Sequence, residues 1–130
     1  MRLAVMSDLH DNLPDWELVL CELQREKITT LLNLGDTVAP DVLAHMGQTF
    51  DGTIHTIFGN NGDRDQELLA IKNIPTIIHH GAVGGLEIEG IRIGFVHEPQ
   101  PALSMVRENI FDLVCHGHTH LKRWEPFDKL

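Results

Sequence analysis

Residues 2–10 read RLAVMSDLH, a mostly apolar run that gives way to polar residues ending in a histidine. The run from Arg2 to Met6 predicts a short buried strand. Asp8 and His10 then lie just beyond the predicted strand end. Four more apolar runs along the chain lead in the same way into a side chain that can bind a metal. The fold is therefore expected to gather these side chains at one edge.

The segments between these runs alternate between helical and strand patterns. Asn12 or Asp15 can cap a helix in which Trp16, Leu20 and Leu23 recur at helical spacing. Residues 86–88 and 91–93 alternate around Glu89-Gly90, which predicts a tight hairpin. Strand–helix alternation in the first half predicts a parallel sheet, and the hairpin adds antiparallel pairing, so we expect an α/β fold with a mixed or two-sheet core. Helices are predicted at 12–27, 41–47 (ending at a glycine), 63–71 and 101–109, and further strands at 31–34, 53–58, 95–97 and 113–115.

Composition narrows the classes of function. The chain has 130 residues and a formal net charge of -9, which argues against a partner such as duplex nucleic acid or an anionic membrane. No linker or repeat divides it, so we expect a single domain over residues 1–130. Its first residues do not resemble a signal peptide, and no apolar run is long enough to span a membrane. Cys21 and Cys115 form no disulfide framework, which predicts a reducing, cytoplasmic location.

Seven side chains are candidate metal ligands, because each follows a predicted strand and strand carboxyl ends meet at one edge of an α/β sheet. Taken alone, each has an ordinary structural interpretation, such as a turn residue or a partly buried histidine. Their joint occurrence is what favours a metal site. Gly35, Gly59 and Gly117 each precede a candidate and allow close backbone approach. The candidates are Asp8, His10, Asp36, Asn60, His97, His118 and His120, whereas His45, His55, His79, His80 and His116 are expected on the surface or behind the ligands.

These motifs resemble those of the calcineurin-like metallophosphoesterases, most closely their small bacterial and archaeal phosphodiesterase branch. The matching pieces are Asp8-Leu9-His10, Gly35-Asp36, Gly59-Asn60, His97 and Gly117-His118-Thr119-His120. The resemblance implies a two-sheet αββα sandwich with a dinuclear site at the strand ends. It also implies a metal-dependent phosphodiesterase that hydrolyses small phosphodiesters through a metal-bridging hydroxide.

By the same resemblance, one metal would be held by Asp8, His10, Asp36 and His120, and the other by Asp36, Asn60, His97 and His118. Asp36 would bridge the two ions. Oxygen and imidazole ligands without a thiolate suit two divalent transition-metal ions, with Mn²⁺ preferred and Fe²⁺, Zn²⁺ or Ni²⁺ as alternatives. Such pairs, about 3.5–4 Å apart, serve phosphoryl hydrolysis. The residues assigned to catalysis are Asp36, Asn60 and Asn61.

The sequence also departs from the family pattern. Asn61 stands where many members carry a histidine that assists the leaving group, and asparagine cannot donate a proton in general-acid catalysis. Gly62 occupies the place of an acid, which Asp63 could replace after a loop shift. The branch often shows Thr-His-Gly-His where this chain has Val96-His97-Glu98-Pro99, so the ligand histidine is kept and the second histidine is lost. Good leaving groups, or help from another residue, are therefore expected.

Two further expectations concern partners. The chain continues for only ten residues after His120, and we expect either a trimmed sandwich or a homo-oligomer that covers an exposed sheet edge. The alternative function is a non-catalytic metal-binding scaffold of the same fold, as in a retromer subunit of this superfamily, and the intact ligand set favours the enzyme. Arg64, Lys122 and Arg123 are candidate phosphate contacts, although each is first interpreted as a solvated surface residue.

Overall fold

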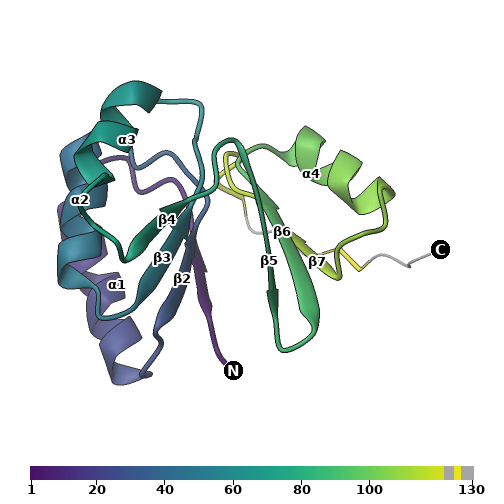
Figure 1. The fold of residues 1–130 in the computed structure, drawn as a ribbon, viewed down its shortest axis with the longest axis horizontal. Helices are drawn as coiled ribbons and strands as arrows, with labels where there is room; N and C mark the ends of the chain where they lie inside the picture. Colours follow the sequence, from purple (N-terminus) through teal and green to yellow (C-terminus); the bar gives the residue numbers. More distant parts are fainter. Residues whose placement is uncertain (122–124, 127–130) are drawn as a thin grey trace.

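Two β-sheets lie face to face in the computed structural model, which describes residues 1–121 and 125–126 (Figure 1). The first sheet is parallel, in the order β1-β2-β3-β4, and the second has the order β5-β6-β7, with β5 and β6 antiparallel and β6 and β7 parallel. Helices α1, α2 and α3 cover the outer face of the first sheet, and α4 covers that of the second (Figure 1). The expected two-sheet α/β sandwich is confirmed. The strands are β1 Ala4–Met6, β2 Thr30–Asn33, β3 Thr53–Thr56, β4 Ile77–His79, β5 Val83–Ile88, β6 Ile91–Val96 and β7 Leu113–Cys115, and the helices are α1 Leu13–Arg25, α2 Pro40–Thr49, α3 Arg64–Ile71 and α4 Pro99–Arg107.

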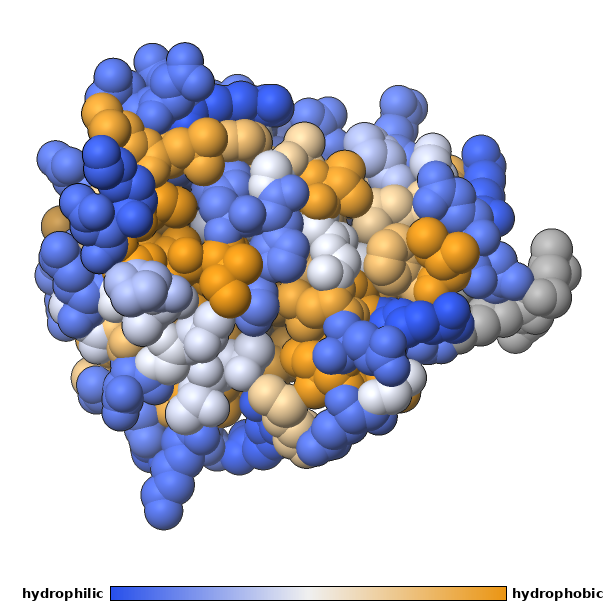
Figure 2. All heavy atoms as spheres, viewed as in Figure 1, coloured by the Kyte–Doolittle hydropathy of each residue, from blue (hydrophilic) through white to orange (hydrophobic). Residues whose placement is uncertain are grey.

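The apolar side chains form three packed clusters. One lies between the first sheet and its helices, and it includes Trp16, whose indole N–H donates to Thr49 Oγ1 at 3.0 Å and so links α1 to α2. A second cluster fills the space between the sheets, and a third lies under α4. On the face seen in Figure 2, hydrophobic residues gather along the middle of the molecule while hydrophilic ones cover its helical flanks. None of the described helices is long and apolar enough to cross a membrane.

Several sequence-based element predictions need correction. Strand β1 is an edge strand rather than a buried one, because it pairs only with β2 among the described strands and Val5 remains 44% exposed. Helix α2 continues past Gly47, where a Cβ would lie 2.4 Å from Ile77 Cδ1, so this glycine allows close packing instead of ending the helix. Strand β4 was not predicted, and α4 begins two residues before the predicted start. The predicted hairpin is present, with positive φ at both Glu89 and Gly90 as a type I′ turn requires.

Two histidines, His55 in β3 and His80 directly after β4, lie close together near the second sheet. His55 Nδ1 and His80 Nε2 are 3.0 Å apart, and the His80 ring meets the Phe95 ring edge-on at 5.0 Å between centroids. Burial, together with the charge of the neighbouring His80, lowers the pKa of His55. Burial, together with the charge of His79, lowers the pKa of His80. The folded state therefore favours the neutral form of both rings.

This pair predicts a pH-dependent stability. Because the folded pKa values lie below the ordinary value of 6.5, the unfolded chain binds more protons near that pH. The free energy of unfolding should therefore rise with pH through this window and fall as the pH drops below about 6.5. In urea titrations of the metal-free protein between pH 5 and 8, His55→Gln should weaken this dependence. The matched variant His45→Gln, on α2, should not, and equal slopes for His55→Gln and the parent chain would contradict the assignment.

Candidate metal centre

The loops that follow the strands are tied to one another by backbone hydrogen bonds. The amides of Asp8 and His10 donate to the carbonyls of Gly35 and Asp36, each at 3.0 Å, so the loops after β1 and β2 run side by side. The amide of Gly117 donates to the His97 carbonyl at 2.9 Å, which does the same for the loops after β6 and β7. The His118 amide donates across the sheets to Asp8 Oδ2 at 2.9 Å. Both sheets therefore deliver their predicted residues to one place (Figure 1).

Left-handed backbone conformations concentrate in these loops. Non-glycine residues seldom adopt positive φ, and the cost is of order 1–3 kcal/mol each. Five of the seven candidate ligands do so, and Val38, a β-branched residue in the loop before α2, has φ 79°. Such strained conformations persist only where the surrounding structure holds them, and they are concentrated at functional sites. The five are Asp8 at 60°, His10 at 47°, Asp36 at 57°, His118 at 71° and His120 at 56°.

One cluster of possible ligands contains Asp8, His10 and His120. His120 Nε2 lies 3.2 Å from Asp8 Oδ1, and His10 Nε2 lies 3.5 Å from the same oxygen. The two imidazole rings are 5.3 Å apart and nearly perpendicular, so both direct a ring nitrogen at the carboxylate. His10 and His120 are solvent-exposed whereas the Asp8 side chain is 9% exposed. The cluster therefore opens to solvent on its imidazole side.

The second cluster contains Asp36, His97 and His118, with Asn60 among them. His97 Nδ1–H donates to the Leu34 carbonyl at 2.7 Å, so in the neutral ring Nε2 presents a lone pair. That nitrogen faces Asn60 Oδ1 at 2.8 Å and Asp36 Oδ2 at 3.3 Å. Asn60 Oδ1 also lies 2.9 Å from Asp36 Oδ2 and 3.2 Å from His118 Nδ1. With its amide oxygen and nitrogen exchanged, Asn60 donates hydrogen bonds to His97 and Asp36. In the orientation described, its oxygen would instead bind a cation held among these atoms.

Such a set of converging acceptors fits a divalent metal ion. Lone pairs of oxygen and nitrogen that face one another repel, and a cation between them turns the repulsion into coordination. Imidazole, carboxylate and amide oxygen together suit Mn²⁺, Fe²⁺, Zn²⁺ or Ni²⁺. The donor set of the second cluster therefore fits a metal, and the first cluster offers the same ligand chemistry.

Asp36 lies between the two clusters. Its side chain is 2% exposed, and Oδ2 is 3.3 Å from His97 Nε2 and 3.5 Å from His10 Nε2, which belong to different clusters. The backbone N–H of Asn61 donates to Oδ1 and its side-chain NH₂ donates to Oδ2, both at 2.9 Å. Asn61 thus fixes the orientation of this carboxylate. The structure brings all of the predicted site residues together.

Asp8 is held in its ionised form. Burial alone would raise its pKa, but the Ser7 hydroxyl donating at 2.6 Å, the His118 amide and the charge of His97 together lower it below the ordinary value. Sequence reasoning did not select Ser7. The signal that could have found it is the serine hydroxyl immediately before a candidate ligand, a position from which it can bond the neighbouring carboxylate.

Two glycines leave room for the carboxylates. A Cβ on Gly59 would lie 2.0 Å from Asp36 Oδ1, and one on Gly117 would lie 2.0 Å from Ser7 Oγ and 2.7 Å from Asp8 Oδ2. Gly35, at φ 94°, meets the Gly59 backbone in the same way, with 2.6 Å between its Cβ position and the Gly59 nitrogen. The glycines predicted beside the ligands are therefore needed where the loops cross.

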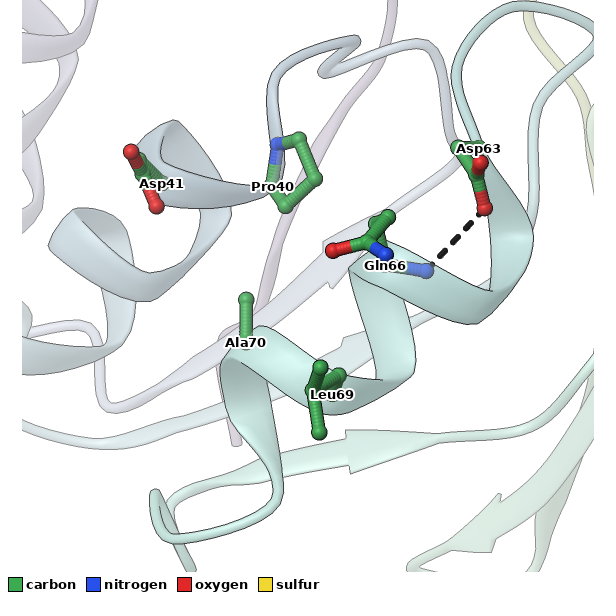
Figure 3. A pocket seen from close by; sticks show the side chains of 6 residues that line it. All are labelled: Pro40, Asp41, Asp63, Gln66, Leu69 and Ala70. Atoms are coloured by element: carbon green, nitrogen blue, oxygen red, sulfur yellow. Dashed lines mark hydrogen bonds between the residues drawn. The ribbon is translucent and has the colours of Figure 1, made fainter.

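Asp63 does not take part in the cluster. It is the N-cap of α3, and its Oδ1 accepts the Gln66 amide at 3.1 Å (Figure 3). It also lines a cavity of about 450 Å³ between the start of α2 and the length of α3, to which none of the seven candidate ligands contributes. The cavity and the ligand clusters are thus separate features. Of the candidate phosphate contacts, Lys122 and Arg123 fall outside the described residues.

A two-sheet α/β sandwich with carboxylates and imidazoles gathered at its strand ends defines the class of metallophosphoesterases. The chain belongs to the calcineurin-like phosphoesterase superfamily, whose domain matches residues 1–130. It is 29% identical over 132 residues to the phosphodiesterase MJ0936 of Methanocaldococcus jannaschii, which covers 98% of this chain and 78% of that protein. Family membership implies divalent metal ions and a phosphoester substrate.

Solved structures agree with this assignment. A novel archaeal phosphodiesterase superposes with a TM-score of 0.87 at 28% identity, covering 100% of this chain and 80% of that one. Vps29 of Chaetomium thermophilum gives a TM-score of 0.64 at 20% identity, covering 98% of this chain and 67% of that one. The second likeness shows the shared fold alone.

Removal of the Ser7 hydroxyl tests how Asp8 is held. In Ser7→Ala, Asp8 Oδ2 keeps only the His118 amide, the pKa of Asp8 rises, and the carboxylate is less well oriented. Loss of such a supporting bond typically lowers metal affinity about 10–100-fold. Calorimetric titration with Mn²⁺ at neutral pH should show that at least one equivalent of Mn²⁺ binds more weakly than to the parent chain. Ser104→Ala, which removes an exposed hydroxyl on α4, is the control, and unchanged binding by Ser7→Ala would refute the supporting role.

Proposed function

We propose that this protein is a phosphodiesterase that hydrolyses small phosphodiesters with two divalent metal ions. One ion would be held by Asp8, His10, Asp36 and His120 and the other by Asp36, Asn60, His97 and His118. Mn²⁺ is the preferred ion, with Fe²⁺, Zn²⁺ and Ni²⁺ as alternatives. The observation that carries the proposal is the position of Asp36 between the two ligand clusters, with its Oδ2 3.3 Å from His97 Nε2 and 3.5 Å from His10 Nε2.

The residues of the chain would orient the reacting groups. Bound ions would supply Lewis acidity and an activated water nucleophile for attack on phosphorus. Asp36 would connect the two clusters, because one of its oxygens lies within 3.5 Å of a histidine from each. Asn61 fixes Asp36, and the bond from His97 to the Leu34 carbonyl aims its other nitrogen into the site. No side-chain nucleophile is required.

Access and charge favour a small anionic ester. Asn60, Asn61, His118 and His120 are exposed, so a phosphate group can approach the clusters from solvent. Asn61 can hydrogen-bond an oxygen but cannot protonate a leaving group. Esters with good leaving groups should therefore react fastest. The diester preference also draws support from the similarity to the archaeal phosphodiesterases.

Asp36→Asn tests the proposal. The variant keeps the shape of the side chain but removes the charge shared by both clusters, and we expect hydrolysis of bis(4-nitrophenyl) phosphate to fall by 100-fold or more. Activity is measured with Mn²⁺, Fe²⁺, Zn²⁺ and Ni²⁺ over aryl phosphomonoesters, aryl phosphodiesters and cyclic nucleotides. Asp51→Asn, an exposed carboxylate outside the site, is the matched control. Full turnover by Asp36→Asn at saturating metal would contradict the bridging role. If the parent chain has no activity with any metal, the non-catalytic metal-binding scaffold is favoured instead.

We also propose a homo-oligomer in a reducing, cytoplasmic environment. Strand β1 has no neighbour on its outer side among the described strands, and both cysteines are unpaired. Light scattering coupled to size-exclusion chromatography should give a mass that is a multiple of the 14.6 kDa chain. A monomer at every protein concentration would refute the oligomer.

A further inference from the structure

Arg64 is stacked on an aromatic ring beside the metal centre. It is the first residue of α3, and its guanidinium carbon lies 4.7 Å from the centroid of the Phe58 ring. Phe58 directly precedes Gly59 and Asn60 in the loop after β3. Phe58, Asn61 and Arg64 lie around one surface hollow that is too narrow for a water molecule, and the side chains of Asp63 and Glu67 also line it. Asn61 is also the residue that holds Asp36, so this hollow adjoins the two clusters.

Neighbouring side chains hold the Phe58 ring in place. The His79 ring packs against it at 4.2 Å between centroids. His79 Nδ1 accepts the Gly81 amide at 3.0 Å, so in the neutral ring Nε2–H donates to Glu67 Oε2 at 2.9 Å. The side chains of His79 and Glu67 are only 6% and 15% exposed. Glu67, His79 and Phe58 therefore form a stationary platform for the guanidinium.

Arg64 also keeps its charge unpaired in acidic surroundings. Asp63 and Asp65 flank it, yet Arg64 forms no ion pair with a carboxylate in the part of the chain that the structure describes. Asp63 is occupied in capping α3, and Glu67 is occupied by His79. Three other arginines, in contrast, pair with carboxylates within 3.2 Å. They are Arg2 with Glu26, Arg25 with Glu22 and Arg92 with Asp112.

We propose that Arg64 binds an oxyanion of the substrate beside the metal centre, an inference that rests on the proposed function. A guanidinium presents planar, always charged donors that match phosphate or carboxylate oxygens. Stacking on Phe58 orients this plane in advance, so less side-chain entropy is lost on binding. Asn60 precedes Arg64 by four residues, a span of at most about 14 Å between Cα atoms. The oxyanion is either the reacting phosphate or a second anionic group on the ester.

The first arm of the test uses inorganic phosphate and bis(4-nitrophenyl) phosphate. Arg64→Gln should raise KM for the diester and the inhibition constant of phosphate about 10-fold, with kcat changed less than 2-fold, if Arg64 contacts the reacting phosphate. Arg64→Lys should restore part of the loss. Phe58→Leu should raise the same constants by a smaller factor, because the cation remains but its platform is lost. Arg107→Gln, an exposed arginine of α4, is the matched control and should behave as the parent chain.

The second arm compares two 4-nitrophenyl phosphodiesters whose other alcohol is either ethanol or glycolate. If Arg64 binds a second anion, Arg64→Gln should raise KM for the glycolate ester alone and leave phosphate inhibition unchanged. If Arg64 binds the reacting phosphate, Arg64→Gln should raise KM for both esters by the same factor. Equal KM values and equal phosphate inhibition for Arg64→Gln and the parent chain would overturn the proposal, as would the same losses in Arg107→Gln.

Calorimetric titration separates this inference from the proposed function. If the parent chain hydrolyses no ester, the function fails, and binding of inorganic phosphate and of glycolate to the metal-loaded protein decides the role of Arg64. Weaker binding of either anion by Arg64→Gln, with Arg107→Gln unchanged, supports it. Equal affinities, or no binding of either anion by the parent chain, would overturn it.

Discussion

The buried carboxylate of Asp36 is the constraint on which the rest of the site depends. It is 2% exposed, and its Oδ2 lies 3.3 Å from His97 Nε2 and 3.5 Å from His10 Nε2, with the Asn60 amide beside it. A buried charge among acceptors is costly unless donors or a cation compensate it. Asn61 supplies two donors, and the ligand chemistry of both clusters is suited to divalent ions. Residues from the loops of both sheets surround this carboxylate.

Backbone strain and the candidate metal ligands occur in the same loops. Asp8 and His118 both have positive φ and are joined across the sheets by a hydrogen bond from the His118 amide. The glycines between them allow the loops to cross at distances that a Cβ would forbid. The cost of these conformations has to be offset by the packing of the three apolar clusters and by the hydrogen bonds between the loops, which hold the candidate ligands in position before any ion binds.

The sequence predicted the parallel sheet, the hairpin and the gathering of seven polar residues, because each depends on a local pattern with a known spatial consequence. Asp8, Asp36 and Asn60 follow apolar runs, and the carboxyl ends of parallel strands share an edge. Other features depend on tertiary approach and leave no local pattern. The exposure of Val5 depends on which strand pairs with β1, and the role of Gly47 depends on Ile77, which is 30 residues later in the sequence. The packing of His79 against Phe58, the ring on which Arg64 stacks, likewise joins residues that only the fold brings together.

The central claim is that two ions share the Asp36 carboxylate. Anomalous X-ray scattering from crystals grown with Mn²⁺ measures this directly, because it locates each ion without reference to activity. The account predicts two peaks per chain, one bounded by Asp8, His10 and His120, the other by Asn60, His97 and His118, with Asp36 between them. A single peak, or peaks that lie away from Asp36, would contradict it.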